Sequence, residues 1–359
     1  MTSIPQNISR DRITKICTQL GLHFLGTVRL EVESDFQNFK QWISLKKHAG
    51  MHFLEKNHEL REDPRLLLEG VQTAVVFGLP YYRGDRINDK GPPKIAQYAR
   101  MTDYHKQIWK SGEYLMDRIH QECVGEQFGR VVVDSAPILE RAMAKRTGGG
   151  FIGKNTCFIS PKEGSFFLLG EVLTTALLPV SDYIAIDPKK RTKDGGCGSC
   201  KRCQVHCPTG ALDKDYQLDA NRCLAYWTIE HRGLIPERFW PYLKTYWFGC
   251  DICQLVCPYN RGIKKAQIKD NQKRSFPDVF DVAVMNQKEY EKYFGGTPLT
   301  RAKISGLRRN ALIALAVTSD LRLQKAISCV ASDDKETLTG TVDQIKKWVA
   351  KRNGAQDWT

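Results

Sequence analysis

The sequence lacks any long apolar run. Over 359 residues, no stretch approaches the roughly 18 consecutive apolar residues that a membrane-spanning helix needs. The opening sequence, MTSIPQNISRDRITK, contains neither an apolar segment nor a twin-arginine pair, and export signals depend on such features. We therefore expect a cytoplasmic protein without membrane spans, in a compartment where thiols remain reduced.

Acidic residues are scarce relative to basic ones. Lys and Arg number 54 against 40 Asp and Glu, so the formal net charge is +14. Counted by segment, residues 1–185 carry +3, residues 186–260 carry +3 and residues 261–359 carry +8. Such a balance favours a polyanionic partner, nucleic acid before membrane, because Lys and Arg that neutralise phosphates release counterions. A solvated basic surface without a partner is the alternative.

Cysteine, in contrast, is abundant and concentrated. Eight of the twelve cysteines lie between Cys197 and Cys257, in CGSCKRCQVHCP, at Cys223 and in CDICQLVCP. The first block has the CxxCxxCxxxCP spacing of bacterial ferredoxins, whose fourth cysteine binds the other cluster. The second block lacks one cysteine, which Cys223 can supply. We predict two [4Fe–4S] clusters, held by Cys197, Cys200, Cys203 and Cys257, and by Cys207, Cys223, Cys250 and Cys253.

Structural zinc and disulfides are the alternatives for these cysteines. Zinc sites use CxxC pairs but rarely show this crossed arrangement or a Pro after each last cysteine. Disulfides are typical of small secreted domains. The other four cysteines, Cys17, Cys123, Cys157 and Cys329, stand singly in apolar or helical surroundings, so we expect them to be inert packing residues.

The chain divides into three predicted regions. Residues 1–187 alternate strand-like and helix-like segments and read as an α/β domain, with strands at 71–81, 130–133, 156–160 and 165–169 and a helix from Asp103. Residues 188–260 form a ferredoxin-like domain with two clusters. Residues 261–359 read as a basic helical region with helices at 277–293, from 306 and at 333–352, and RRNALIAL after Gly306 is typical of HEAT-like repeats.

Asp134 is the most informative residue of the first region. It ends an apolar strand, the place where open α/β sheets bind ligands, and it could act as a general acid if burial raised its pKa. A simple helix N-cap is an equally good interpretation. The glycine-rich loop from Gly148 to Gly153 is followed by Lys154 and Asn155, but it lacks the Ser or Thr of a P-loop and leads into a strand, which argues against nucleotide hydrolysis.

Several motifs together resemble the epoxyqueuosine reductase family. They are DYHK at 103–106, DSAPILERAMAKRTGGGFIGKNT at 134–156, YWTIEHRG at 226–233, GCDICQLVCPYN at 249–260 and the eight cysteines. The resemblance spans about residues 40–260. It implies an α+β sandwich-like domain that binds cobalamin, and a monomeric enzyme that reduces epoxyqueuosine to queuosine at the wobble position of a tRNA anticodon. Electrons would come from an external donor through the two clusters.

The same resemblance implies roles for individual residues. Asp134 would be the proton donor to the opened epoxide. Cobalamin, in its base-off form, would contact Asn57, Tyr98, Asp134, Gly153, Lys154, Asn155, Phe158, Ala225 and Asp251. Ala225 replaces a usual serine and Ala96 stands where some relatives have cysteine, so a polar contact is in doubt; the helical tail is also shorter than usual. A cobalamin-dependent reductive dehalogenase and a ferredoxin-like electron carrier are the alternative functions.

Overall fold

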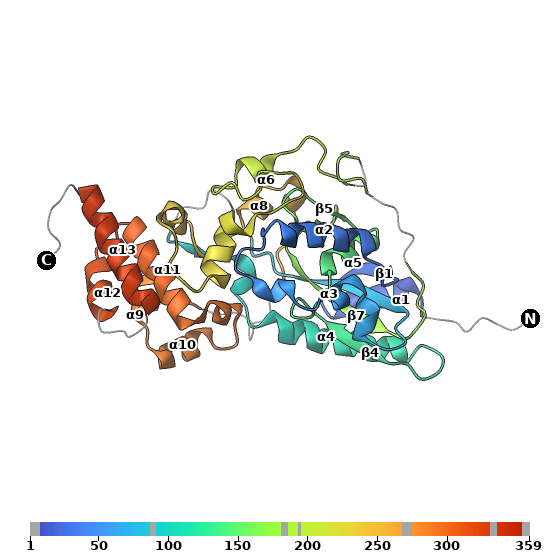
Figure 1. Cartoon of the computed structure of the whole chain (residues 1–359). Coiled ribbons are helices and arrows are strands. Elements are labelled where there is room, and N and C mark those ends of the chain that lie inside the picture. The colour runs from blue at the N-terminus through green and yellow to red at the C-terminus, as the bar shows by residue number, and fades with distance from the viewer. Residues whose placement is uncertain are drawn as a thin grey trace, which may run out of the picture.

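The computed structural model describes most of the chain in six stretches. These are residues 8–86, 91–180, 186–192, 195–267, 275–330 and 336–353. The molecule is elongated, with a sheet and its helices at one end and a bundle of helices at the other (Figure 1). The first and last described helices, α1 (Arg10–Gln19) and α13 (Glu336–Asn353), lie near these opposite ends.

A four-stranded antiparallel sheet organises the amino-terminal region. The strands, in spatial order, are β1 (His23–Val28), β2 (Thr73–Pro80), β7 (Phe167–Thr174) and β4 (Gly129–Val132). In β2 every residue from Thr73 to Gly78 is buried, because both faces of the sheet are covered. We expected an α/β domain; the antiparallel pairing makes the region α+β, closer to the sandwich that the family resemblance implied.

Helices cover both faces of this sheet. On one face, α1 and α4 (Tyr104–His120) pack against Val75 and Phe77 of β2 through Ile13, Ile108 and other buried residues. On the other, α5 (Glu140–Arg146) places Ala142, Met143 and Ala144 against Val76 and Leu173. The short helices α2 (Glu33–Ser44) and α3 (His58–Glu62) follow β1 in the chain. Figure 1 shows α4 along the lower edge of the molecule.

The predicted elements of this region differ from the observed ones mainly at their ends. The helix from Asp103 is α4, and Asp103 is its N-cap, accepting a 3.0 Å hydrogen bond from the His105 amide. The strand expected at 165–169 runs on to Thr174 because Glu171, which interrupts the apolar pattern, is buried within it.

A small hairpin joins the sheet region to the cysteine-rich segment. Strands β5 (Phe151–Ile152) and β6 (Phe158–Ile159) pair antiparallel, and the turn between them carries Lys154 and Asn155. Thr156 takes a positive φ of 63° in this turn, and its amide donates to the carbonyl of Gly153 at 2.8 Å. The turn thereby presents its polar residues to the cysteine-rich segment.

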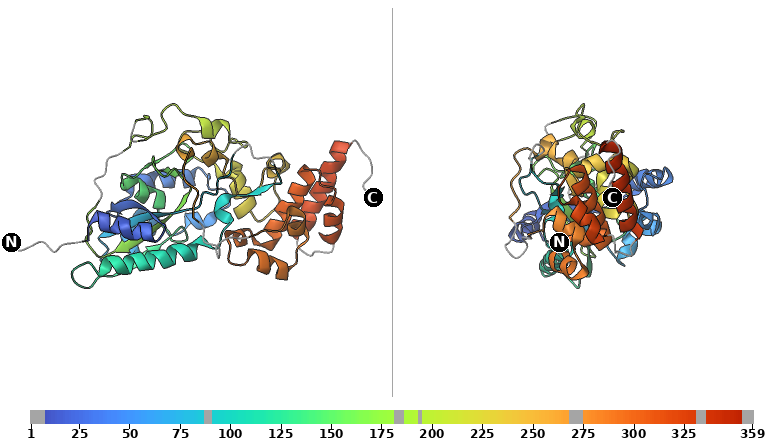
Figure 2. Two further views of the ribbon diagram at one scale, coloured as in Figure 1. Left: turned by 180° about the vertical axis from the view of Figure 1, so that it is seen from behind. Right: turned by 90° about the vertical axis from the view of Figure 1, so that its left-hand side faces the viewer.

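The cysteine-rich segment consists of short elements. They are α6 (Arg202–Val205), η4 (Ala220–Arg222), the π-helix η5 (Tyr226–Glu230), η6 (Glu237–Phe239), α7 (Trp240–Leu243), β8 (Tyr246–Phe248), α8 (Ile252–Leu255) and η7 (Pro258–Asn260). Helices α6 and α8 lie side by side at the top of the molecule (Figures 1 and 2). Strand β8 pairs with β3 (Lys94–Ile95), which ties this segment to the first region. Lys193 and Asp194, near the start of the predicted ferredoxin-like domain, lie outside the described residues.

The carboxyl-terminal region is helical. Its elements are α9 (Val279–Val284), α10 (Gln287–Phe294), η9 (Pro298–Ala302), α11 (Lys303–Val317), α12 (Leu323–Val330) and α13. The single helix expected at 277–293 is broken into α9 and α10, because Asn286 and Glu289 form a capping box that starts a new helix. The expected start of the last helix, Asp333, lies outside the described residues. Among the described helices, none is long and apolar enough to cross a membrane.

Helix α11 is the centre of this region, and it is buried on nearly all sides. Arg309 is fully buried and donates to the carbonyls of Trp227, His231 and Gly233 at 2.9, 2.9 and 2.6 Å. Asn310 donates to the carbonyl of Thr228 at 2.8 Å. Two polar residues of α11 therefore fix the backbone around η5, and Arg309 does not contribute to the basic surface that the charge count suggested.

Candidate functional site

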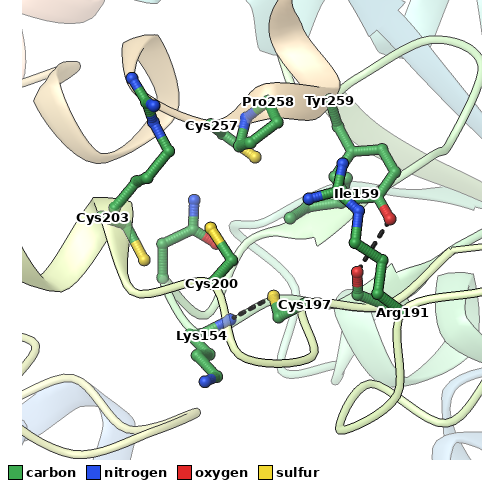
Figure 3. Close-up of a pocket in the computed structure, with 12 residues that line it drawn as sticks. Lys154, Ile159, Arg191, Cys197, Cys200, Cys203, Cys257, Pro258 and Tyr259 are labelled. Carbon is green, nitrogen blue, oxygen red and sulfur yellow. Dashed lines mark hydrogen bonds between the residues drawn. The ribbon is translucent and has the colours of Figure 1, made fainter.

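Four of the predicted cluster ligands line one pocket. We call Cys197, Cys200, Cys203 and Cys257 the first quartet. The first three precede or begin α6, and Cys257 follows α8, so the side-by-side packing of these helices brings the fourth thiol to the other three (Figure 3). The amide of Lys154, from the hairpin turn, lies 3.4 Å from the sulfur of Cys197. Amides that point at cluster sulfurs are a typical feature of iron–sulfur sites.

The other four predicted ligands also gather, on the inner side of the segment. We call Cys207, Cys223, Cys250 and Cys253 the second quartet. Burial raises the pKa of Cys223 and of Cys250, and the charge of the Cys207 thiolate raises both further. Cys250 and Cys223 act in the same way on Cys253. These electrostatic effects indicate that the thiols lie near one another, and their assignment as the ligands of one cluster stays a prediction.

A compact group of possible metal ligands lies outside both quartets. His48, His52 and Glu55 bring three possible ligand atoms within 4.8 Å of one another.

Cys157 lies where we did not expect it. We expected an inert packing residue, but its thiol interacts with that of Cys253, a member of the second quartet. Cys329, also expected to pack in the interior, is exposed, whereas Cys17 is buried as expected. The sequence offers no signal for the Cys157 contact, because the two residues lie on different segments of the fold.

Asp134 follows β4 and forms part of a hydrogen-bonded group. Its Oδ1 lies 2.8 Å from Nε2 of His105, and its Oδ2 accepts a 2.5 Å hydrogen bond from the hydroxyl of Tyr104. The other ring nitrogen of His105 lies 2.7 Å from the Asp103 carboxylate. The Asp134 side chain is still 44% exposed, so a ligand can reach it. The group is built by the first turn of α4 facing the end of β4.

These contacts shift the pKa values in opposite directions. Partial loss of water would raise the pKa of Asp134, but the hydrogen bonds from His105 and Tyr104 and the charge of His105 lower it on balance. The hydrogen bond to Asp134 raises the pKa of His105 to about 9, against the effect of burial. Burial and the Asp134 charge raise the pKa of Tyr104. At neutral pH the ionisable proton is therefore on His105, and Asp134 is a carboxylate.

An arginine from the carboxyl-terminal region completes the surroundings. Arg301 of η9 forms a bidentate ion pair with Glu230, with its shortest contact at 2.7 Å, and its guanidinium lies 5.2 Å from the ring of Phe53. Its charge also lowers the pKa of Asp134. Three segments thus meet beside Asp134. They are the segment that carries Phe53, the η5 turn with Glu230, and η9 with Arg301.

The residues expected to contact cobalamin fall into two groups. Tyr98 stands beside this site, with its ring centroid 6.3 Å from that of Tyr104. Asp251 is buried, accepts a 2.8 Å hydrogen bond from the amide of Gln97, and has its pKa raised to about 6 by burial. Asn57 is exposed and adopts a left-handed backbone with a φ of 54°. Ala225 immediately precedes η5.

The other group lies against the cysteine segments or in the core. Asn155 donates to the carbonyl of Cys253 at 3.2 Å, and the Lys154 ammonium pairs with Asp215 at 3.0 Å. Gly153 precedes them in the same turn. The ring of Phe158 packs in the sheet core against Phe167. Only backbone atoms of Phe158 are suited to contact a ligand.

Sequence reasoning alone did not assign three residues that the structure places at the site. Tyr104 and His105 were noted only within the DYHK motif, although two polar aromatic residues directly after an N-cap aspartate are a usable signal. Arg301 had no signal, because it lies in a short irregular segment that meets Asp134 only through the tertiary fold.

Comparisons with known proteins agree with this architecture. Residues 196–260 match the family model of a 4Fe-4S double cluster binding domain, and residues 61–135 match that of epoxyqueuosine reductase QueG, DUF1730. The epoxyqueuosine reductase of Xanthomonas campestris is 33% identical over 313 residues, 85% of each chain. The chain belongs to the epoxyqueuosine reductase family. The enzyme of Escherichia coli is 32% identical over 83% of this chain and 78% of its own.

Solved structures of this family have the same fold. That of the Streptococcus thermophilus epoxyqueuosine reductase superimposes with a TM-score of 0.80 at 26% identity, covering 97% of this chain and 94% of the other. A second, 24% identical, contains an epoxyqueuosine-modified tRNA stem loop and also gives a TM-score of 0.80. The predicted family is confirmed, the chain is an oxidoreductase with a double [4Fe–4S] domain, and neither the dehalogenase nor the electron-carrier alternative is favoured.

Proposed function

We propose that this protein reduces epoxyqueuosine in tRNA to queuosine, with cobalamin as the reactive cofactor and two [4Fe–4S] clusters as its electron supply. The observation that carries the proposal is the meeting of an acid–base group at Asp134 with the segment that holds the eight cysteines, in a chain of this family. A net charge of +14 supports a tRNA substrate, since each Lys or Arg that neutralises a phosphate strengthens binding.

Three regions share the work in this proposal. Residues 1–187 form the cobalamin-binding part, residues 188–260 the two-cluster part, and residues 261–359 a HEAT-like helical part that supports η5 and η9. The first quartet would hold one cluster and the second quartet the other. We place the protein in the cytoplasm, where tRNA and reduced thiols are present.

The residues at the site suit cobalamin. Tyr98 supplies an aromatic surface, Asp134 stays open to a ligand at 44% exposure, and Asn57 projects from a left-handed turn. Backbone groups near Ala225, Phe158 and Asp251 would hold the corrin. Reduced cobalamin would supply the electrons that reduction of the epoxide needs.

Electrons would cross from the first quartet to the second and then to the site. Asp251, next to Cys250, binds the amide of Gln97, and Tyr98 follows Gln97 and reaches Tyr104. The second cluster is therefore the inner one. Reduction of an epoxide to an alkene takes two electrons and two protons and releases the oxygen as water, which a relay of two one-electron clusters can supply.

Protons would reach the epoxide oxygen through Asp134. Because Asp134 is ionised at rest, the proton comes from His105, 2.8 Å away, and Asp134 passes it to the oxygen as negative charge develops there. Tyr104 holds the carboxylate in place from its other oxygen. Asp103 fixes the His105 ring and stabilises its charged form. This keeps the proton-donor role that we predicted for Asp134 and adds the source of its proton.

An anaerobic turnover assay tests the function. The protein with both clusters is mixed with cobalamin, a reductant and tRNA that carries epoxyqueuosine, and the nucleosides are analysed by mass spectrometry. We expect epoxyqueuosine to be replaced by queuosine, lighter by one oxygen atom. Unchanged epoxyqueuosine, with the clusters reduced and cobalamin bound, would contradict the proposal.

A further inference from the structure

The surface over the first quartet is basic. Five basic residues surround it, and all five side chains are exposed. They are Lys189, Lys190, Arg191, Lys201 and Arg202, which we call the basic rim. The rim is built around the cluster site itself, because Arg191 and Arg202 line the same pocket as the first quartet. Figure 3 shows Arg191 beside the cysteines.

The fold holds the two halves of the rim in place. On one side, the amides of Cys197 and Gly198 donate to the carbonyl of Pro188, so the turn at 188–191 wraps onto the cluster loop. Arg191 also lies 5.4 Å over the ring of Tyr259. On the other side, Arg202 donates to the carbonyl of Val256 at 3.0 Å, which joins α6 to α8. The rim is thus a fixed feature of the cluster site.

Acidic groups do little to neutralise this surface. Asp215 is paired with the buried ammonium of Lys154 at 3.0 Å. Asp187 is exposed but accepts a 2.9 Å hydrogen bond from the amide of Lys189. In residues 186–192 and 195–202, the five basic side chains are therefore balanced by one acidic residue, Asp187.

An apolar residue stands beside the basic rim. Val205, the last residue of α6, is 77% exposed. A small apolar contact next to a charged patch is common at protein interfaces, where charge guides the encounter and apolar contact holds it. The rim also lines a predicted cluster site, to which a protein carrier can deliver electrons and nucleic acid cannot, so we favour a protein partner.

The position of this surface suits electron entry. The second quartet is connected through Asp251 and Gln97 to Tyr98 and the candidate site, so the first quartet is the outer one. Helix α6 lies at the top of the molecule, whereas α4, whose first turn carries Tyr104 and His105, lies along the bottom (Figure 1). A carrier on the basic rim would leave access to the Asp134 site open.

We propose that the basic rim and Val205 form the docking surface for an acidic one-electron carrier protein. This inference rests on one part of the proposed function, namely that the first cluster accepts electrons. Each docking transfers one electron from the reduced carrier to the oxidised first cluster, and two such events supply one turnover. Complexes of this kind are transient and bury little area, so a small charged patch is sufficient.

Stopped-flow reduction of the clusters tests the docking surface. The full chain with both clusters is mixed anaerobically with a reduced flavodoxin, a small acidic flavoprotein, and the loss of cluster absorbance gives a second-order rate constant. We expect the double variant Lys190→Glu, Lys201→Glu to react at least about 10-fold more slowly at low salt. The difference should shrink at about 0.15 M salt, where charges are screened.

Three controls make the result specific. Dithionite, a small reductant, should reduce parent and variant equally fast, which shows that the clusters are intact. A matched double variant, Lys110→Glu with Lys288→Glu, changes the net charge equally at two exposed positions on α4 and α10 and should keep the parent rate with flavodoxin. Val205→Ser should slow reduction by flavodoxin without changing its dependence on salt.

Two outcomes would overturn the inference. The first is a rate constant for the rim variant with flavodoxin that equals that of the parent or that of the matched control. The other is a rim variant that keeps its reduction rate but loses affinity for a tRNA stem loop, which would make the rim an RNA surface. Because the readout is cluster absorbance, failure to form queuosine would contradict the proposed function and leave this result unaffected.

Discussion

Nε2 of His105 lies 2.8 Å from Oδ1 of Asp134, while Nδ1 of the same ring lies 2.7 Å from the carboxylate of Asp103. The imidazole is held between two carboxylates and is therefore charged at neutral pH. An Asp134 that faces this cation is ionised, so it can donate a proton only after receiving one. The acid of this site is a pair of residues, not one.

The pH dependence of turnover reports this pair. The pKa of His105 is raised to about 9, so His105 is charged below pH 9 and the supply of protons is lost as the pH rises through that value. We expect turnover to fall on the alkaline side near pH 9. In His105→Gln this limb should disappear while the rate at pH 7 falls by roughly 100-fold.

Cluster content and cobalamin affinity should be unchanged in His105→Gln, since no cysteine or corrin contact is altered. Asp103→Asn is the companion variant: without its charge, the pKa of His105 should fall and the alkaline limb should move to lower pH. A His105→Gln profile that matches the parent from pH 6 to 10 would assign the histidine a structural role only.

Glu171 predicts an unusual dependence of stability on pH. It is fully buried in β7, and within the described part of the chain neither of its carboxylate oxygens has a hydrogen-bond partner. Burial, and then the charge of Asp134, raise its pKa to about 8. The folded protein keeps this proton between about pH 4.5 and 8 while the unfolded chain loses it, so stability falls as the pH rises through this window.

Glu171→Gln should remove that slope. We expect the variant to gain on the order of 3 kcal/mol relative to the parent between pH 5 and pH 8, measured by anaerobic urea unfolding. Glu126→Gln, an exposed acid before β4, the strand that pairs with β7, is the control and should not change the slope. Parallel pH curves for Glu171→Gln and the parent would show that Glu171 is neutralised in another way.

Arg309 should be essential for the stability of η5. Its guanidinium donates hydrogen bonds to three carbonyls, one within η5 and two in the residues directly after it, and it is fully buried. Arg309→Ala leaves these carbonyls without partners, so we expect a loss of about 3–5 kcal/mol in unfolding free energy. Lys346→Ala, on the exposed side of α13, should cost less than about 0.5 kcal/mol.

Iron analysis tests the ligand sets. Two [4Fe–4S] clusters hold about eight irons per chain. Cys253→Ala should retain about half of that iron, because the second quartet loses a ligand. Cys157→Ala should retain all of it, because Cys157 contacts Cys253 without being needed as a ligand. If Cys157→Ala loses a cluster and Cys253→Ala does not, the ligand is Cys157 and not Cys253.

Local patterns predicted the parts of the fold that local forces determine. Asp103 marked the start of α4 because an N-cap acts within one turn, and the β-branched run of β2 marked a strand. The cysteine spacing defined two quartets because short turns leave few ways to group eight thiols. Helix α12 and strand β1 went unpredicted, since both are short and their apolar residues gain their burial from distant partners.

The same reasoning explains why parts of the site were missed. The contact between His105 and Asp134 joins residues 29 positions apart, and no periodicity links them. A charge count treats each arginine as surface charge because arginine is seldom buried, yet Arg308 and Arg309 both lie inside, with backbone carbonyls as partners. Exposure of Asp134 beside buried neighbours is likewise a property of the assembled fold.

The most direct test of the central claim compares the parent with Asp134→Asn in a single anaerobic turnover on tRNA that carries epoxyqueuosine. Iron content and cobalamin binding are measured on the same samples. We predict that the parent forms queuosine and that Asp134→Asn, with both clusters and cobalamin retained, forms it at least about 100-fold more slowly. Queuosine formation by Asp134→Asn at the parent rate would contradict the account.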